Sequence, residues 1–157
     1  MIKLPHPINS SYLTIGNERI LNMKILIVSP GEIPCEKEIN SGLKAMQSVV
    51  EGSIEAIYPF SENVAIVCNQ DAKLKKLQLN RGLYSEDNGE LYDIIAGTFF
   101  ICGLGEDNFC SLPKEYIDKF KEKFYLPELP IYSNGKIAMK KVEVEEYHRV
   151  YELFSLI

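Results

Sequence analysis

The stretch LNRGLYSEDNGELYDIIAGTFFICGLG, residues 79–105, combines an Asn-Arg pair, an acidic turn and a long apolar run. Asn88-Gly89 near its middle is among the strongest hairpin dipeptides, because both positions tolerate a positive φ. The residues after this turn, LYDIIAGTFFICG, predict a central strand in which Gly97 indicates a bulge or a close approach of another backbone. We therefore expect residues 79–105 to form the hairpin that completes a β-sheet.

The segments before this hairpin predict a strand, a helix and a second hairpin. MKILIVSPGE, residues 23–32, is a run of strand formers that ends at a Pro-Gly pair. EINSGLKAMQSVVEG carries apolar residues at spacings of four, three and four, which predicts an amphipathic helix near 39–51. SIEAIYPF and NVAIVCN, residues 53–60 and 63–69, alternate apolar positions and predict paired strands.

The segments after it predict two further helices. LPKEYIDKFKEKF, residues 112–124, has Pro113 near its start and large apolar residues at every fourth position, which is typical of an amphipathic helix. Ser111 is expected to cap its N-terminus, and the prolines of LPELP, residues 126–130, end it and mark a linker. Beyond a further Asn-Gly turn, helical spacing predicts a C-terminal helix that contains Tyr147, Val150, Tyr151 and Phe154.

Together these segments predict an α+β fold with a mixed or mainly antiparallel sheet of about four to six strands, two main helices and a C-terminal helix. The length of 157 residues suits one ordinary domain. We divide the chain into an N-terminal extension (1–22), a core α+β domain (23–124) and a C-terminal extension (125–157). The apolar content of the last segment favours packing on a second subunit, as in a homodimer, over packing on its own core.

The charge and hydropathy pattern excludes several classes of protein. The net charge is -5 and the pI is about 5.1, whereas a nucleic-acid surface needs lysine and arginine to replace counterions, so general nucleic-acid binding is not expected. The longest apolar runs, 25–28 and 94–105, are shorter than the roughly 18 residues that span a bilayer. The N-terminus lacks the apolar core of a secretory signal. We therefore expect a cytoplasmic protein without a membrane partner.

The cysteines and histidines predict no metal site and no nucleophilic catalysis. The four cysteines lack a C-x-x-C spacing, and Cys68 and Cys102 lie in apolar runs typical of reduced core residues; the other two are Cys35 and Cys110. Only His6 and His148 are available to complete a zinc site or a catalytic set. GLGED, residues 103–107, is too short and too acidic for a phosphate loop. No cofactor is expected.

Asn80 and Arg81 are the leading candidates for binding a ligand. The planar guanidinium suits a phosphate or carboxylate, and the neighbouring amide is able to read a base edge. The alternative is a structural ion pair that holds the loop closed, with Asp93, Glu86 or Asp87 as the carboxylate.

Four other residues complete the candidate ligand site. Tyr58 offers a stacking face, although an aromatic residue at a strand end also suits the core. Asn69 either caps its hairpin or faces a cleft. Thr98 is able to donate to an anion but is also a good strand former. Burial of Asp93 among apolar residues would suit a general acid or base, while an ion pair or turn hydrogen bond is the simpler role.

The ordered segments MKILIVSPGE, EKEI, GSIEAIYPF, VAIVCN, LNRGL and GELYDIIAGTFFICG resemble domain-of-unknown-function family 3846, small proteins of phages and mobile elements in Gram-positive bacteria. The resemblance covers residues 23–124. It implies a mobile-element setting and no particular reaction. Because the family-like segment begins at Met23, either Met1 or Met23 is a possible translation start.

Two functional hypotheses follow. The first is a non-enzymatic phage or mobile-element protein that captures a small nucleotide signal or blocks a host defence protein, which the lack of a catalytic constellation favours. The second is a small hydrolase of a nucleotide or phosphorylated substrate, with Asp93 as general base and Arg81 stabilising the anion.

Overall fold

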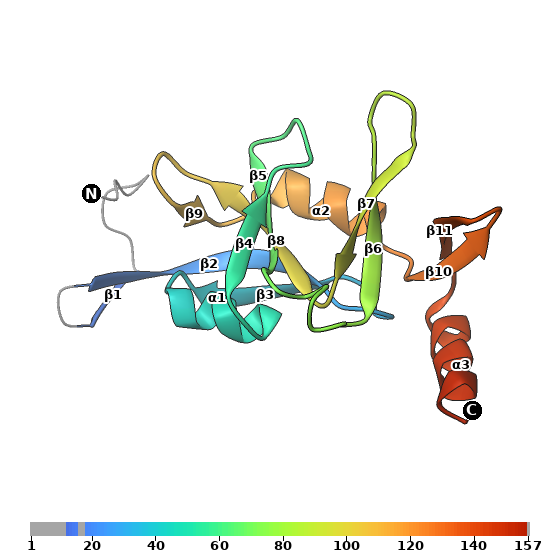
Figure 1. Ribbon diagram of the computed structural model, residues 1–157. Coiled ribbons are helices and arrows are strands. Elements are labelled where there is room, and N and C mark those ends of the chain that lie inside the picture. Colours follow the sequence, from blue (N-terminus) through green and yellow to red (C-terminus); the bar gives the residue numbers. More distant parts are fainter. Residues whose placement is uncertain (1–11, 16–17, 157) are drawn as a thin grey trace.

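The computed structural model describes residues 12–15 and 18–156 and is built on an antiparallel sheet (Figure 1). The strands follow the order β1 (Tyr12–Ile15), β2 (Glu18–Val28), β8 (Phe99–Leu104), β5 (Val64–Asn69) and β4 (Ile54–Ile57), while β3 (Cys35–Asn40) pairs with β2 and β9 (Phe109–Cys110) pairs with β8. All of these pairs are antiparallel. The expected α+β class with a mainly antiparallel sheet is confirmed.

Different helices cover the two faces of this sheet. Successive strand residues point to opposite faces. Leu26 therefore belongs to the apolar cluster that packs against α2 (Lys114–Lys123), and Ile25 belongs to the cluster that packs against α1 (Leu43–Val50). The predicted β4–β5 hairpin is confirmed, and its second strand is buried along its whole length.

The helix predicted near 39–51 begins later, at Leu43, because residues 35–40 form β3. This strand pairs with β2 and is exposed at every position except the half-buried Ile39. Because an exposed edge strand shows no alternation of apolar residues, the sequence pattern did not indicate β3. The predicted helix therefore started too early, at Ile39. The Asn40 side chain accepts a hydrogen bond from the Gly42 backbone, 3.0 Å away, at the start of α1.

The helix predicted over 112–124 corresponds to α2, but its N-terminus differs from the expectation. Pro113 occupies the N-cap, and no side chain there caps the helix. The Ser111 hydroxyl instead accepts a hydrogen bond from the Lys24 backbone at 2.9 Å and ties the helix start to β2. The apolar positions are buried as expected, including Leu112, Phe120 and Phe124.

The predicted central strand over 91–103 is two strands. β7 (Leu91–Ala96) ends before Gly97, whose φ of 76° turns the chain before β8 begins. β6 (Leu79–Tyr84) pairs with β7 in a separate two-stranded sheet. The hairpin around Gly89 therefore forms, but β8 alone enters the main sheet.

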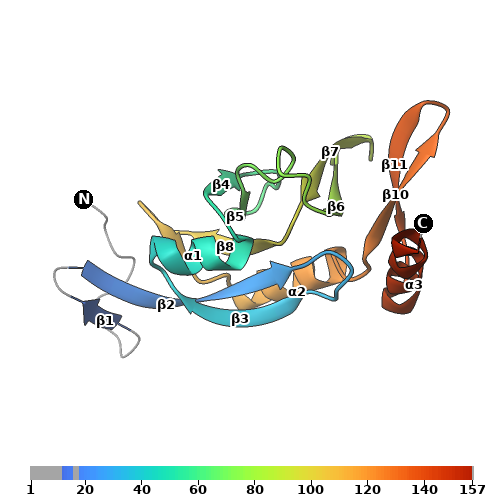
Figure 2. The same ribbon diagram turned by 60° about the horizontal axis from the view of Figure 1, so that its bottom comes forward.

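The C-terminal segment forms a hairpin and a helix at the end of the structure opposite β1 (Figure 2). β10 (Glu128–Ser133) and β11 (Lys136–Lys141) pair around an Asn-Gly turn, and α3 (Val144–Ser155) is the expected C-terminal helix. β10 begins inside the segment predicted to be a linker and lies beside β6. Tyr147 of α3 is 1% exposed and its ring packs against the turn at Gly31.

Candidate functional site

Two adjoining cavities lie where the end of α2 meets the β6–β7 and β10–β11 hairpins. The first, which we call the lysine groove, is an open cavity of about 490 Å³ lined mainly by the last residues of α2, the segment after it and Lys141. The second, which we call the aromatic pocket, measures about 90 Å³ and is lined by Phe60, Tyr84, Tyr92 and Glu128, among others. Lys123 and Lys141 line both cavities, so these two side chains form a wall that the cavities share.

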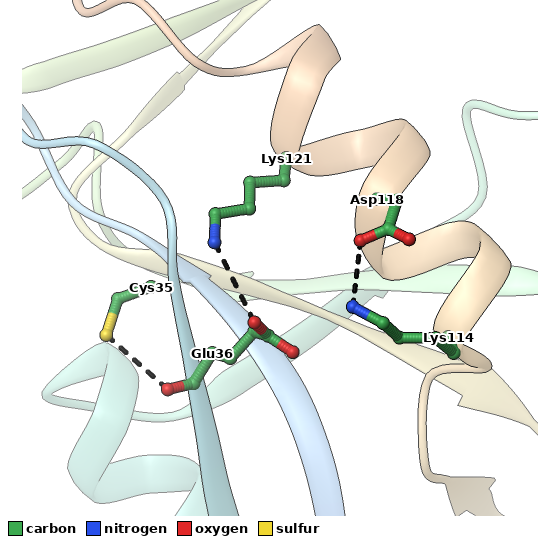
Figure 3. A network of polar contacts seen from close by, with 5 residues as sticks. All are labelled: Cys35, Glu36, Lys114, Asp118 and Lys121. Carbon is green, nitrogen blue, oxygen red and sulfur yellow. Dashed lines mark hydrogen bonds and ion pairs between the residues drawn. The ribbon is translucent and has the colours of Figure 1, made fainter.

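Part of the charge beside the lysine groove is engaged within the protein (Figure 3). Lys121 Nζ lies 3.7 Å from a carboxylate oxygen of Glu36 on β3, and Lys114 Nζ lies 2.9 Å from Asp118 one helical turn further along α2. Cys35 donates to the main-chain oxygen of Glu36 in the same network. These contacts join α2 to the edge strand β3 and occupy Lys121.

Lys123 and Lys141 differ from Lys121, because neither takes part in an ion pair within the described residues. Lys123 Nζ lies 5.3 Å from the centre of the Phe60 ring, in cation-π geometry. Both side chains are exposed. The junction of the two cavities therefore presents two ammonium groups without an ion pair in the described part of the chain, while the carboxylates of Asp118 and Glu122 line the groove beside them.

Aromatic rings form much of the wall of the smaller cavity. Phe60 packs on Phe120 with ring centres 4.7 Å apart, which anchors it to the core. Tyr84 and Tyr92, on the paired strands β6 and β7, are 39% and 57% exposed. Planar groups that enter the pocket would thus meet aromatic faces.

Glu128 is a buried carboxyl in this wall, with only 2% of its surface exposed. Its Oε1 accepts hydrogen bonds from the Gly82 backbone at 3.2 Å and from the Tyr84 hydroxyl at 3.0 Å. Burial raises the pKa of Glu128, although these hydrogen bonds and the charges of Arg81 and Lys141 oppose the shift. Burial and the nearby carboxylate raise the pKa of Tyr84 to about 12, so its hydroxyl remains a donor.

Sequence reasoning missed Glu128 because it treated LPELP as a linker. The available signal was a single charge within the otherwise apolar run YLPELPIY, residues 125–132. A charged residue in such a run is either paired or functional.

The side chains of the predicted pair, Asn80 and Arg81, are fully buried and donate hydrogen bonds to backbone carbonyls. Arg81 donates to the carbonyl of Phe124 from Nε at 3.2 Å and from Nη2 at 2.9 Å, and Nη2 also donates to the Glu32 carbonyl at 2.7 Å. Nη1 donates to Asn80 Oδ1 at 2.9 Å. Burial lowers the pKa of Arg81 to about 10, although the Glu128 charge opposes this. The guanidinium contacts neither a surface ligand position nor the carboxylates expected for a loop ion pair.

Asn80 and Thr98 meet at the C-terminal end of β2. Asn80 Nδ2 donates to the carbonyls of Val28 and Gly97, at 2.9 and 2.8 Å, and so bridges the end of β2 to the break between β7 and β8. The Thr98 hydroxyl donates a hydrogen bond to the Ser29 hydroxyl, 3.2 Å away. The structure thus brings Asn80, Arg81 and Thr98 together, as a framework beneath the end of α2.

A family model described as a domain of unknown function, DUF3846, matches residues 23–125. The chain belongs to the DUF3846 family. No curated protein and no solved structure matches the chain. The DUF3846 match contains the main sheet from the middle of β2, both covering helices and the β6–β7 hairpin. Glu128 and Lys141 follow it, so the aromatic pocket combines the DUF3846 segment with the hairpin beyond.

The other three predicted residues of the DUF3846 segment lie apart from this framework. Asn69 is buried and donates to the carbonyls of Val50 and Glu51, at 3.1 and 3.3 Å, which satisfies the C-terminal end of α1. Asp93 has the simpler of its two expected roles, because its side chain is 45% exposed and forms a 2.5 Å ion pair with Lys73. Tyr58 is 61% exposed, and Phe60 rather than Tyr58 lines the aromatic pocket.

The cysteines of the DUF3846 segment are free thiols. Cys68 and Cys102 are buried as expected, and burial raises the pKa of their thiols to about 11 and about 12. Neither is therefore a reactive thiolate at neutral pH. Over residues 12–15 and 18–156, no three His, Cys, Asp or Glu side chains are grouped to hold a metal ion. No helix in the same part of the chain is long and apolar enough to cross a membrane.

Proposed function

We propose that this chain is a non-enzymatic binding protein that captures a small anionic ligand of the nucleotide type. The observation that carries the proposal is the position of Lys123 and Lys141, two exposed lysines without an ion pair in the described residues, between an aromatic pocket and an open groove. A nucleotide joins the two groups that such a junction suits, a planar base and a phosphate.

The physical chemistry of the two cavities matches these two groups. Lysine ammonium groups bind phosphate oxygens as point charges, and aromatic faces stack on bases of any identity. The groove volume of about 490 Å³ lies within the range of small-molecule sites, roughly 300–1,000 Å³. We place the phosphate beside Lys123 and Lys141 and the edge of the base in the aromatic pocket, whose volume of about 90 Å³ holds only part of a ring system.

The mobile-element setting that the family resemblance implies provides a biological role for nucleotide capture. A phage or mobile-element protein that binds a nucleotide signal lowers the free concentration of that signal, and thus its effect on a host defence. Capture needs affinity and no turnover.

The proposal is tested by incubating the purified chain with nucleotides, cyclic ones included, and identifying what is released on denaturation. Intact ligand supports capture. A converted product supports the hydrolase instead, and no bound ligand supports a protein partner.

A charge variant tests the site itself. Replacing both Lys123 and Lys141 by glutamine should weaken nucleotide binding roughly tenfold or more, because two phosphate contacts are lost. The matched control replaces Lys44 and Lys75, which are also exposed and do not line either cavity. Equal affinity of the two double variants would move the ligand away from this junction.

A protein partner, such as a host defence protein, is the second candidate. It is favoured by apolar side chains of the C-terminal segment that are more than half exposed: Tyr132, Leu153, Phe154 and Leu156. A second copy of the chain is another possible occupant of this surface. The hydrolase has less support, since its anion-binding Arg81 is fully buried and its base Asp93 is paired with Lys73.

A further inference from the structure

We propose that Glu128 is the specificity-determining residue of the aromatic pocket and that it selects guanine among the nucleotide bases. This inference rests on the nucleotide capture proposed above, and it adds the identity of the base and the residue that reads it.

The carboxyl of Glu128 is held in one orientation at the pocket wall. Both hydrogen bonds that it accepts within the described part of the chain end at Oε1, from the Gly82 backbone and the Tyr84 hydroxyl. These two donors fill Oε1 and leave Oε2 as the acceptor for a ligand. Because backbone and side-chain donors fix the group before binding, little ordering remains to oppose recognition.

Gly82 makes this arrangement possible. A Cβ at this position would lie 2.7 Å from Leu91 Cδ1 and 3.0 Å from the Tyr84 hydroxyl oxygen. Any larger residue would therefore displace the hydroxyl that orients Glu128. The same residue of β6 thus lacks a side chain where space is short and supplies the backbone donor.

The chemistry of the base edges decides which base fits a carboxylate. Guanine presents two neighbouring donors, N1–H and the N2 amino group, to an acceptor-only partner. Adenine and cytosine each place a ring-nitrogen acceptor beside a single amino donor, and uracil places a carbonyl on either side of its one N–H. A buried carboxylate repels those acceptors, so guanine is preferred.

The surroundings of Glu128 favour a base over another donor. Phe60, Tyr84 and Tyr92 supply faces for a planar ring in the same pocket. Lys123 and Lys141 stand at its border with the groove, where the phosphate of a bound nucleotide would lie. Guanine recognition and phosphate binding thus take place at two neighbouring cavities that share Lys123 and Lys141.

The test is calorimetric titration of the full chain with GMP, AMP, CMP, UMP and IMP. We expect GMP to bind roughly tenfold or more tightly than the others. IMP keeps N1–H but lacks the N2 amino group, so its weaker binding tests the two-donor contact without any change to the protein.

The Glu128→Gln variant should change the preference. Its amide oxygen keeps the bonds from Gly82 and Tyr84, so a donor NH₂ replaces Oε2. GMP should then lose roughly tenfold or more in affinity, while AMP, which offers a ring-nitrogen acceptor, should bind at least as well as before. Glu115→Gln is the control, because it removes the same charge from an exposed position of α2.

The outcomes separate the two proposals. Equal binding of all five nucleotides, or equal binding of GMP and IMP, overturns the guanine assignment and leaves nucleotide capture in place. Loss of GMP binding in Glu115→Gln as large as that in Glu128→Gln also overturns the role of Glu128. Binding of none of the nucleotides overturns nucleotide capture itself.

Discussion

The Arg81 guanidinium donates to the main-chain carbonyl of Phe124 through both Nε, at 3.2 Å, and Nη2, at 2.9 Å. Phe124 is the C-cap residue of α2, where carbonyls lack helical partners and a cation is favourable. The bond pair therefore fixes β6 to the end of the helix that carries Lys123. The same guanidinium reaches the Pro-Gly turn after β2 through the Glu32 carbonyl, at 2.7 Å.

Replacing Arg81 with methionine should lower the free energy of unfolding by roughly 3–5 kcal/mol, because several buried acceptors lose their donor at once. Urea unfolding measures the change. Lysine at this position keeps the charge but lacks the planar fork, so it should recover only part of the loss. Arg149→Met, at an exposed position of α3, should change stability by less than about 0.5 kcal/mol. A similarly small effect at Arg81 would contradict its framework role.

Gly31→Ala should destabilise the protein and loosen α3. Gly31 has a φ of 78°, and a Cβ there would overlap the Tyr147 ring. Gly135→Ala is a matched control, since Gly135 has a φ of 76° but no atom within 4 Å of the added Cβ. The control isolates the backbone strain, about 1 kcal/mol, and Gly31→Ala should cost roughly 1–3 kcal/mol more. Equal losses in urea unfolding would mean that the turn and Tyr147 are not tightly packed.

Glu128 should make the protein less stable as the pH rises. Burial raises the pKa of its folded-state carboxyl above the ordinary value of 4.5, so the folded state binds more protons between those two values. The free energy of unfolding therefore falls as pH increases from about 4.5 through the folded-state pKa, and the loss persists above it. The glutamine of Glu128→Gln does not titrate, so no buried charge develops as the pH rises. The variant should therefore be at least as stable as the wild type at pH 7. Urea unfolding of both chains between pH 4 and 8 isolates the contribution, and a variant that is less stable at pH 7 would contradict it.

The C-terminal segment should mediate self-association, most simply as a dimer. Phe154, on α3, and Leu156, its C-cap, are 65% and 82% exposed, an unusual exposure for large apolar side chains at the end of one short helix. Replacing both with glutamate should convert the dimer to a folded monomer in light scattering. Leu74, which is 85% exposed elsewhere, provides the control for adding charge to an apolar surface position. A wild-type chain that is monomeric at high concentration would reject the prediction.

Sequence patterns predicted the elements whose apolar residues repeat regularly. α2 and α3 each bury one periodic face, and alternate residues of β5 enter the apolar clusters on the two faces of the sheet. β3 was missed because its sequence, CEKEIN, belongs to an exposed edge and carries charge at half of its positions. The break at Gly97 was predicted only as a bulge, because an apolar run does not reveal that its two halves enter different sheets.

The candidate site was harder to predict than the fold. Arg81 was predicted as a ligand residue from its chemistry, but its partners are main-chain carbonyls 43 and 49 positions away. Every residue has a main-chain carbonyl, so the sequence does not indicate which ones an arginine contacts. Glu128 and Lys141 lie far from Phe60 along the chain and meet it only through the packing of three separate elements. Such a pocket depends on tertiary contacts that local patterns do not encode.

The family match ends at residue 125, before the last two charged residues that line the aromatic pocket. Residues 23–125 supply Phe60, Tyr84, Tyr92 and Lys123, whereas Glu128 and Lys141 belong to the hairpin that follows. A relative with the same domain and a different continuation would keep the aromatic side of the pocket and lack its Glu128 and Lys141. Replacing the β10–β11 hairpin would also remove the contacts of β10 with β6 and of Glu128 with Gly82 and Tyr84, so a new hairpin must supply packing as well as ligand contacts.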